Sequence, residues 1–289
     1  MDVAAILDRH FASSAPPADL VLGDLDVPIH PNAHIRAAAL RADRDRVRAT
    51  GRWLARHGID RSAVTVGLLL LGTDEPTARD VPLIQTLGLL SDHFGAAAAD
   101  ALSRGRAATE QLIWLAQRVA GWGRVYVVRA LCGRGGGRDW LLRHACDGEF
   151  LNGYFAGQVA TAAHLHEAIT RPDADDDLVD HTGRLLLSMS DCDGMGLTLD
   201  TYPPAPLVLE AYAGHLSRQT PTTDRFLTAA VLAANHAGAR RCLDILNRPD
   251  WSALRFDPDD QYVSWFAPTA VRLGLRAFQG HDHNPRPEY

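Results

Sequence analysis

The sequence predicts an all-α protein, organised as an irregular α-solenoid of stacked helix-turn-helix pairs. Apolar residues recur at spacings of three and four along most of the 289 residues, whereas the alternation typical of strands is scarce. Glycine, proline or aspartate turns separate these segments, so that helix pairs recur about every 25–45 residues without a strict repeat. Two short helices with one apolar stripe each cannot close a core alone, so neighbouring pairs are expected to stack.

The expected elements follow from apolar periodicity and from residues that cap or break helices. Residues 15–32 are rich in proline and aspartate and are expected to be irregular. Gly58 closes a long amphipathic helix, and Asp60 is the expected N-cap of the next one. Acids at 171–177 and threonines at 220–223 are expected to begin two later helices. The expected helices are 2–12, 33–57, one from Asp60 to 72, 77–92, 94–104, 107–120, one on each side of the glycine-rich turn 133–138, 154–170, 175–189, 205–218, 222–238, 239–247 and 259–278.

The middle of the chain carries the most regular pair, "GRVYVVRAL…RDWLLRHAC" at 123–146. Each of its two helices has one apolar face. The same pattern recurs less clearly at 178–189 and 226–246. Over about residues 105–250 the chain therefore resembles the HEAT-like repeat proteins. The resemblance implies HEAT-like repeats at 105–280. The N-terminal third departs from it, and residues 1–104 are expected to form a helical cap or a separate helical layer. A flexible tail is expected at 281–289, and the whole is expected to be one continuous unit.

Composition bounds the class of protein and its setting. With 46% hydrophobic and 22% charged residues, the chain can bury a large core. A net charge of −6 argues against a protein that coats nucleic acid, although a local basic face stays open. We expect four reduced cysteines, no signal peptide, no membrane span and therefore a cytoplasmic protein.

Every basic side chain apart from histidine is an arginine, and eight arginines fall between 36 and 61. Because aspartates are interleaved with them, the expected structure is a solvated helix face with pairs at i, i+4. The alternative is a basic stripe that faces an acidic partner or nucleic acid.

The segment "SDCDGMGLTLDTYPPAP" at 190–206 has three aspartates, Asp191, Asp193 and Asp200, around two glycines. If Gly194 is aligned with the glycine of an EF-hand loop, Met189 takes the first ligand position, where it cannot bind calcium. A structured turn with acid-capped backbone is therefore expected, and a functional loop facing a groove is the alternative.

Other motifs are incomplete. The glycines of 133–138 follow a helix and not a strand, so they do not match a phosphate-binding loop. The histidines of "HLHE" (164–167) point apart on a helix, and no G-x-S-x-G is present. No metal and no cofactor are expected.

The candidate binding residues are aromatic, charged or amide side chains of the middle pair and the acids of the 190–206 turn. They are Trp122, Tyr126, Arg129, Asp139, Trp140, Arg143, Asn152, Asp191, Asp193 and Asp200. Exposed aromatic residues with arginine are typical of binding hot spots. We therefore expect a non-catalytic scaffold that binds a protein or peptide through its concave face, although catalysis stays open.

Two alternatives come from other classes. Some HEAT-like proteins are DNA glycosylases that remove alkylated purines with a basic face, tryptophans and an aspartate. That resemblance implies a role for Trp140, Asp139 and Arg143, although the net acidity argues against nucleic acid. A compact bundle acting on a small molecule, as enzyme or carrier, would instead have a deep pocket near 190–202.

Overall fold

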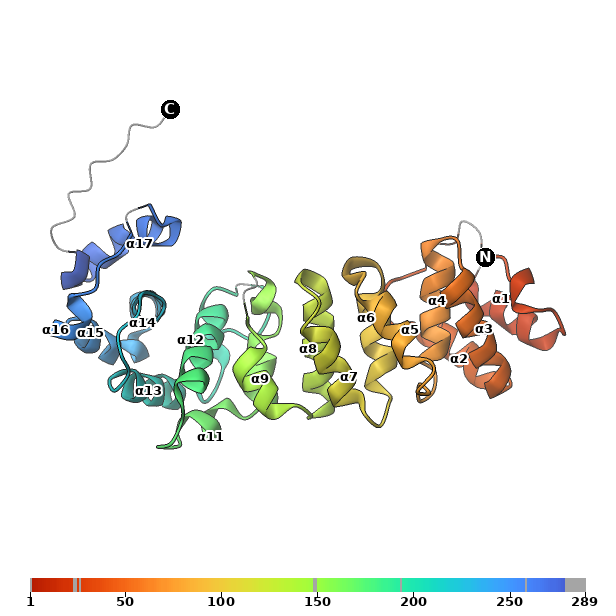
Figure 1. Ribbon diagram of the computed structural model, residues 1–289, viewed down its shortest axis with the longest axis horizontal. Coiled ribbons are helices and arrows are strands. Elements are labelled where there is room, and N and C mark those ends of the chain that lie inside the picture. Colours follow the sequence, from red (N-terminus) through yellow and green to blue (C-terminus); the bar gives the residue numbers. More distant parts are fainter. Residues whose placement is uncertain are drawn as a thin grey trace, which may run out of the picture. The chain divides into compact units, whose positions relative to one another are not determined.

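The structure is a computed structural model that describes residues 2–22, 25, 27–147, 150–192, 194–257 and 259–278. Within these ranges every regular element is helical, with seventeen α-helices and five short 3-10 segments (Figure 1). The expected all-α class is therefore confirmed. The tail 281–289 lies outside the described residues.

The chain divides into two compact units. The first comprises Met1–Leu141 with Glu149–Leu151, and the second comprises Leu142–Gly148 with Asn152–Tyr289. The division falls inside helix α9 (Arg138–His144). The expected limit of an N-terminal cap, between 104 and 105, lies inside the first unit.

The first unit is built from helices that pack in two rows. Its other helices are α1 (Val3–Ala12), α2 (Ala33–Arg41), α3 (Arg44–His57), α4 (Arg61–Leu71), α5 (Val81–Gly88), α6 (Ser91–Ser103), α7 (Ala108–Ala116) and α8 (Gly121–Arg134). Helices α4, α6 and α8 pack against one another in that order, while α3, α5 and α7 each pack on their following partner (Figure 1). This order brings α6 and α8 side by side.

The expected helix 33–57 is two helices, so that prediction was wrong in its length. Ala42 is extended, and the Asp43 carboxylate accepts a hydrogen bond of 2.9 Å from the Arg46 backbone N–H, which starts α3. An N-cap thus interrupts a continuous apolar period.

The Arg46 side chain holds the end of α1 through backbone carbonyls. Its guanidinium donates to His10 O at 2.8 Å, to Phe11 O and Ala15 O at 3.1 Å, and to Ser13 O. The last carbonyls of a helix have no partner inside the helix, and this clamp supplies a donor to them, although His10 O also accepts from the Ser13 N–H and hydroxyl.

The second unit repeats the two-row packing. Its helices beyond α9 are α10 (Ala156–Ala162), α11 (Leu165–Ile169), α12 (Asp176–Ser190), α13 (Ala205–Leu216), α14 (Thr223–Asn235), α15 (Arg241–Leu246), α16 (Pro249–Ser252) and α17 (Gln261–Arg272). Helices α10, α12, α14 and α17 form one row, and α11, α13 and α15 form the other. The two rows therefore alternate along the chain.

The expected helix 154–170 is also divided. His164 has φ of 50°, in the left-handed region that non-glycine residues rarely adopt, and this residue separates α10 from α11. The periodicity of the apolar residues continues through this break, because both helices bury one face in the same unit.

The core is formed by aliphatic and aromatic side chains, and the four cysteines are free thiols. Cys146, Cys192 and Cys242 are buried, and Cys132 is half-buried. None of the described helices has both the length and the apolar character that crossing a lipid bilayer requires.

Helices α3 and α4 approach closely at two glycines, Gly51 and Gly67. A Cβ atom added at Gly67 would lie 2.6 Å from the Ala55 backbone nitrogen and 3.0 Å from Gly51 O. We expect Gly67→Ala to lower the free energy of unfolding by about 1–3 kcal/mol, because backbone atoms must move apart. Urea denaturation followed by circular dichroism measures the change.

The matched control is Gly214→Ala in α13, where an added Cβ meets nothing within 4 Å. That variant is expected to be unchanged or more stable by up to about 1 kcal/mol, since alanine favours the helix. Equal stability of the wild-type chain and the Gly67→Ala variant would contradict the prediction.

Candidate functional site

Three of the candidate binding residues lie on one face of α8. Trp122, Tyr126 and Arg129 are four and three residues apart, which is the spacing of neighbours on a helix surface. The Trp122 and Tyr126 rings stack with centroids 6.0 Å apart and planes 26° apart, and Trp122 is 38% exposed. Their spacing in the sequence therefore places these three residues on one face of the helix.

Small residues bring α6 close to this face of α8. A Cβ at Gly95 would lie 3.3 Å from both Gly123 Cα and Tyr126 Cδ2. The alanines of α6 between 96 and 99 are buried with it. Because Gly95 has no side chain, the Tyr126 ring of α8 can lie against this part of α6.

A groove of about 680 Å³ runs along α6 and α8. It is lined by His30, Pro31, Ala96, Ala99, Asp100, Ser103, Arg104, Tyr126, Arg129, Ala130, Gly133 and Arg134. A smaller hollow of about 220 Å³ shares Pro31, Asp100 and Arg104 with it and adds Arg36. Two candidate residues, Tyr126 and Arg129, therefore line the largest of these hollows.

The groove carries positive charge although the whole chain is acidic. Three guanidiniums, of Arg104, Arg129 and Arg134, line it together with one carboxylate, Asp100. Arg104 Nη2 lies 2.9 Å from both Asp100 oxygens, and Arg134 donates to Ser103 O. The charges of the lining therefore sum to a positive value.

The aromatic wall of the groove is also a hydrogen-bond donor. Burial raises the pKa of the Tyr126 hydroxyl, the nearby Asp92 raises it further, and Arg129 opposes this. The hydroxyl therefore keeps its proton at neutral pH. The His30 ring meets the Tyr126 ring edge to face, with centroids 5.5 Å apart.

Trp140 belongs to the core and does not line the groove. Its side chain is 9% exposed, and the Arg124 guanidinium lies 5.6 Å from its ring centroid. Arg124 also donates to Ala116 O at 2.8 Å, which fixes the cation over the ring. Asp139, the preceding residue, is exposed on α9.

Arg143 and Asn152 make structural contacts in the second unit. The Arg143 guanidinium lies 2.5 Å from Asp175 Oδ1, and this hydrogen bond lowers the pKa of the Asp175 carboxyl. Asp175 also caps α12 through the Leu178 N–H. Asn152 is buried and donates to Cys146 O at 3.2 Å. The structure therefore does not gather Trp140, Asp139 and Arg143 around the groove.

The 190–206 segment is a structured turn. Asp191 is the C-cap of α12, Asp200 lies on a 3-10 turn (Leu199–Thr201), and Asp193 lies outside the described residues. Met189 is fully buried. Gly157 leaves only 2.7 Å between an added Cβ and Leu197 O, so the turn packs on α10. In the described part of the chain, no group of three His, Cys, Asp or Glu side chains is placed to hold a metal ion.

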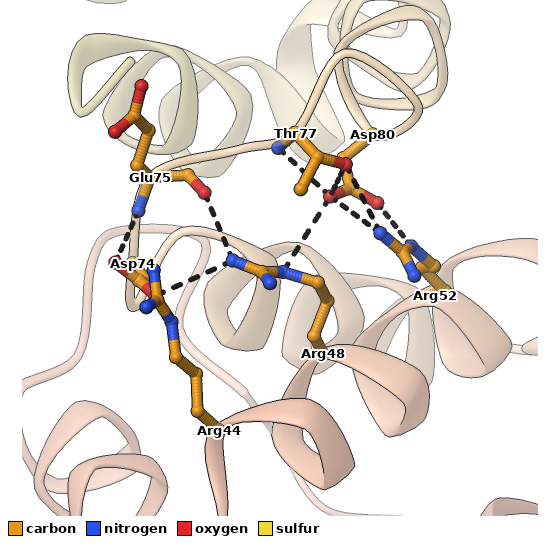
Figure 2. A network of polar contacts seen from close by, with 7 residues as sticks. All are labelled: Arg44, Arg48, Arg52, Asp74, Glu75, Thr77 and Asp80. Carbon is orange, nitrogen blue, oxygen red and sulfur yellow. Dashed lines mark hydrogen bonds and ion pairs between the residues drawn. The ribbon is translucent and has the colours of Figure 1, made fainter. Parts of the chain in front are cut away.

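The arginines of α3 form a ladder with acids of the loop between α4 and α5 (Figure 2). Arg44 pairs with Asp74, Arg48 lies 3.5 Å from Asp74 and 3.9 Å from Asp80, and Arg52 pairs with Asp80. The arginines are four residues apart, as expected for one helix face, but their partners lie some 25–30 residues further along the chain. These arginines are therefore satisfied within the fold.

Asp80 is the buried centre of this ladder and is 1% exposed. Burial alone would raise the pKa of its carboxyl, but hydrogen bonds from Arg52 and Thr77 outweigh this and hold the pKa below 3.8. The Thr77 backbone N–H and hydroxyl donate at 3.1 and 2.7 Å. The carboxylate thus anchors the loop before α5 on α3.

No family model, no curated protein and no solved structure matches this chain.

Proposed function

We propose that this chain is a binding protein, an α-solenoid of HEAT-like helix pairs, that takes an acidic segment of a partner protein into the groove along α6 and α8. The observation that carries the proposal is the gathering of Arg104, Arg129 and Arg134 beside the Tyr126 ring in a groove of about 680 Å³. The whole chain, by contrast, has a net charge of −6.

The packing order of the helices supports the solenoid part of this proposal. Helices contact one another in chain order along a row, as α4, α6 and α8 do in the first unit and α10, α12, α14 and α17 do in the second. Such stacking of helix pairs is how α-solenoids build an extended binding surface. The four free thiols support a reducing, cytoplasmic setting.

The chemistry of the groove favours carboxylates joined to apolar or aromatic side chains. A guanidinium binds a carboxylate through two parallel N–H donors, and such pairs are stronger than neutral hydrogen bonds. The Tyr126 hydroxyl adds a neutral donor, and the Trp122 ring beside it offers a partly exposed stacking surface. Aromatic residues and arginine dominate the energetics of protein interfaces.

A nucleic-acid partner fits these observations less well. Asp100 lies in the groove itself and pairs with Arg104, which leaves fewer cations for a phosphate backbone. The tryptophan that the glycosylase alternative requires, Trp140, is buried under Arg124. A short acidic peptide can bind through the positive charge of the groove alone, without a longer basic surface.

The test is fluorescence anisotropy with a fluorescein-labelled peptide of alternating glutamate and tyrosine, with a lysine–tyrosine peptide and a labelled DNA duplex as comparison probes. We expect the acidic peptide alone to bind at low salt, and Arg129→Glu to weaken its binding about 10- to 100-fold by charge repulsion. The matched control is Arg79→Glu, the same charge change at an exposed position of the same unit outside the groove.

Equal effects of Arg129→Glu and Arg79→Glu would contradict the proposal, because binding would then depend on net charge alone. Tight duplex binding with a steep salt dependence, lost in Arg129→Glu, would replace the acidic peptide by nucleic acid. If no probe binds at low salt, the groove does not select by charge and the proposal fails.

A further inference from the structure

Three side chains of the second unit form a hydrogen-bonded chain of serine, histidine and aspartate. Ser190 Oγ lies 2.8 Å from His236 Nε2, and His236 Nδ1 lies 3.2 Å from Asp200 Oδ1. These residues are up to 46 positions apart in the sequence, so only the fold brings them together. A serine, the far nitrogen of a histidine and a carboxylate in this order are the arrangement that activates a serine nucleophile.

The partners of His236 assign the tautomer of its ring. A carboxylate has no proton to donate, so Nδ1 carries the proton in its contact with Asp200. In a neutral ring Nε2 is then the acceptor, and the Ser190 hydroxyl donates to it. The lone pair of Nε2 therefore points at the proton that must leave when the oxygen attacks.

Each of the three residues is held by a separate element. Ser190 is the last residue of α12, and His236 is the C-cap of α14 with its N–H bonded to Leu232 O at 2.9 Å. Asp200 lies in a 3-10 turn closed by a capping box between Thr198 and Thr201. The geometry is thus set by secondary structure and not by one flexible loop.

The chain of three reaches from the interior to the surface. The His236 side chain is 11% exposed, Asp200 is 84% exposed, and Ser190 is partly exposed. A small reagent can therefore approach Ser190, while most of the imidazole ring is shielded from water.

We propose that Ser190 is a nucleophile toward activated acyl esters, with His236 as its general base and Asp200 as a positioning residue. Ser190 Oγ attacks the carbonyl carbon and its proton passes to His236 Nε2. The bond to the leaving alcohol breaks, and the alcohol departs with that proton. Water then attacks the acyl-serine, gives a proton to His236 that returns to Ser190 Oγ, and releases the carboxylic acid.

The location of Ser190 limits which esters react. The C-terminal end of α12 carries partial negative charge, which favours the imidazolium formed by proton transfer and disfavours an oxyanion. We therefore assign this activity to esters with good leaving groups, whose attack needs little stabilisation of the oxyanion. Phenyl esters and fluorophosphonates are the matching probes.

The test uses the full chain and a fluorophosphonate carrying a dye, in which attack by Ser190 expels fluoride. Tandem mass spectrometry of the labelled protein is expected to place one adduct on Ser190. The matched control is Ser188→Ala, which removes another partly exposed hydroxyl of α12 and is expected to label normally. Hydrolysis of 4-nitrophenyl acetate gives the second readout, with a burst from the acylated enzyme.

We expect Ser190→Ala to abolish labelling and His236→Gln to slow it at least about 100-fold, as for loss of a general base. Asp200→Asn is expected to slow labelling about 3- to 10-fold, with Asp200→Glu restoring most of the rate, and with the thermal unfolding temperature unchanged because Asp200 is exposed. Labelling of the wild-type chain at other serines, no labelling at all, or an unchanged rate in a folded His236→Gln variant would each overturn the proposal.

Discussion

Asp80→Asn is expected to lower the free energy of unfolding by about 3 kcal/mol, because it leaves the guanidiniums of Arg48 and Arg52 beside a neutral group. Asp80 is 1% exposed and accepts from Arg52 and Thr77, so no water replaces the lost charge. Urea denaturation at neutral pH measures the loss. The matched control, Asp8→Asn, breaks the exposed pair with Arg41 and is expected to change stability by less than about 1 kcal/mol.

The same carboxylate makes the free energy of unfolding depend on pH. Its pKa in the folded protein lies below 3.8, so the unfolded chain binds the proton first as the pH falls. The stabilisation is present above about pH 4 and is lost as the pH falls through the pKa of the folded state. In the Asp80→Asn variant, the free energy of unfolding should therefore fall less steeply as the pH is lowered below about 4. A variant that matches the wild-type protein in both stability and acid limb would contradict this role.

The second large effect is expected at alkaline pH, where the folded protein should lose stability steeply above pH 9. Burial raises the pKa of the Cys242 thiol from 9.0 to about 12. The thiol of the unfolded chain then ionises first as the pH rises. By pH 12 this lowers the free energy of unfolding by about 4 kcal/mol for one thiol. Burial raises the pKa of the Cys132 thiol to about 12 as well, so both thiols lower the stability at alkaline pH.

Cys242→Ala tests this, since it removes the titrating group and should flatten the alkaline limb between pH 9 and 12. The matched control is Ile245→Val, a buried truncation in the same helix α15 that lowers stability without changing the slope with pH. Guanidinium denaturation at a series of pH values gives both quantities. Parallel alkaline limbs for the wild-type chain and Cys242→Ala would show that this thiol does not control the alkaline limit.

Helix starts could be predicted from the sequence because they depend on local hydrogen bonds. Asp60, Asp175 and Thr222 each accept the backbone N–H three residues on, as their types and positions before apolar segments indicate. The breaks at Ala42 and His164 were missed. At both positions the apolar period runs on through the break, because the two helices bury the same side of the unit, so periodicity alone carries no signal.

The candidate groove could be predicted only in part. Trp122, Tyr126 and Arg129 lie on one helix face, which follows from their spacing. His30 and Arg104 reach the same groove from other segments, and no local pattern marks them. The contact of Ser190 with His236 depends in the same way on the packing of α12 against α14. Long-range neighbours of this kind require the fold.

The guanidinium clamp of Arg46 on the end of α1 has a consequence for chemical modification. The chain has no lysine, so reagents that acylate lysine amines leave the clamp untouched. Dicarbonyl reagents that condense with guanidinium groups would instead remove the donors to His10, Phe11 and Ala15 carbonyls. Surface conjugation through arginine would therefore loosen the first helix, whereas the usual amine labelling would spare it.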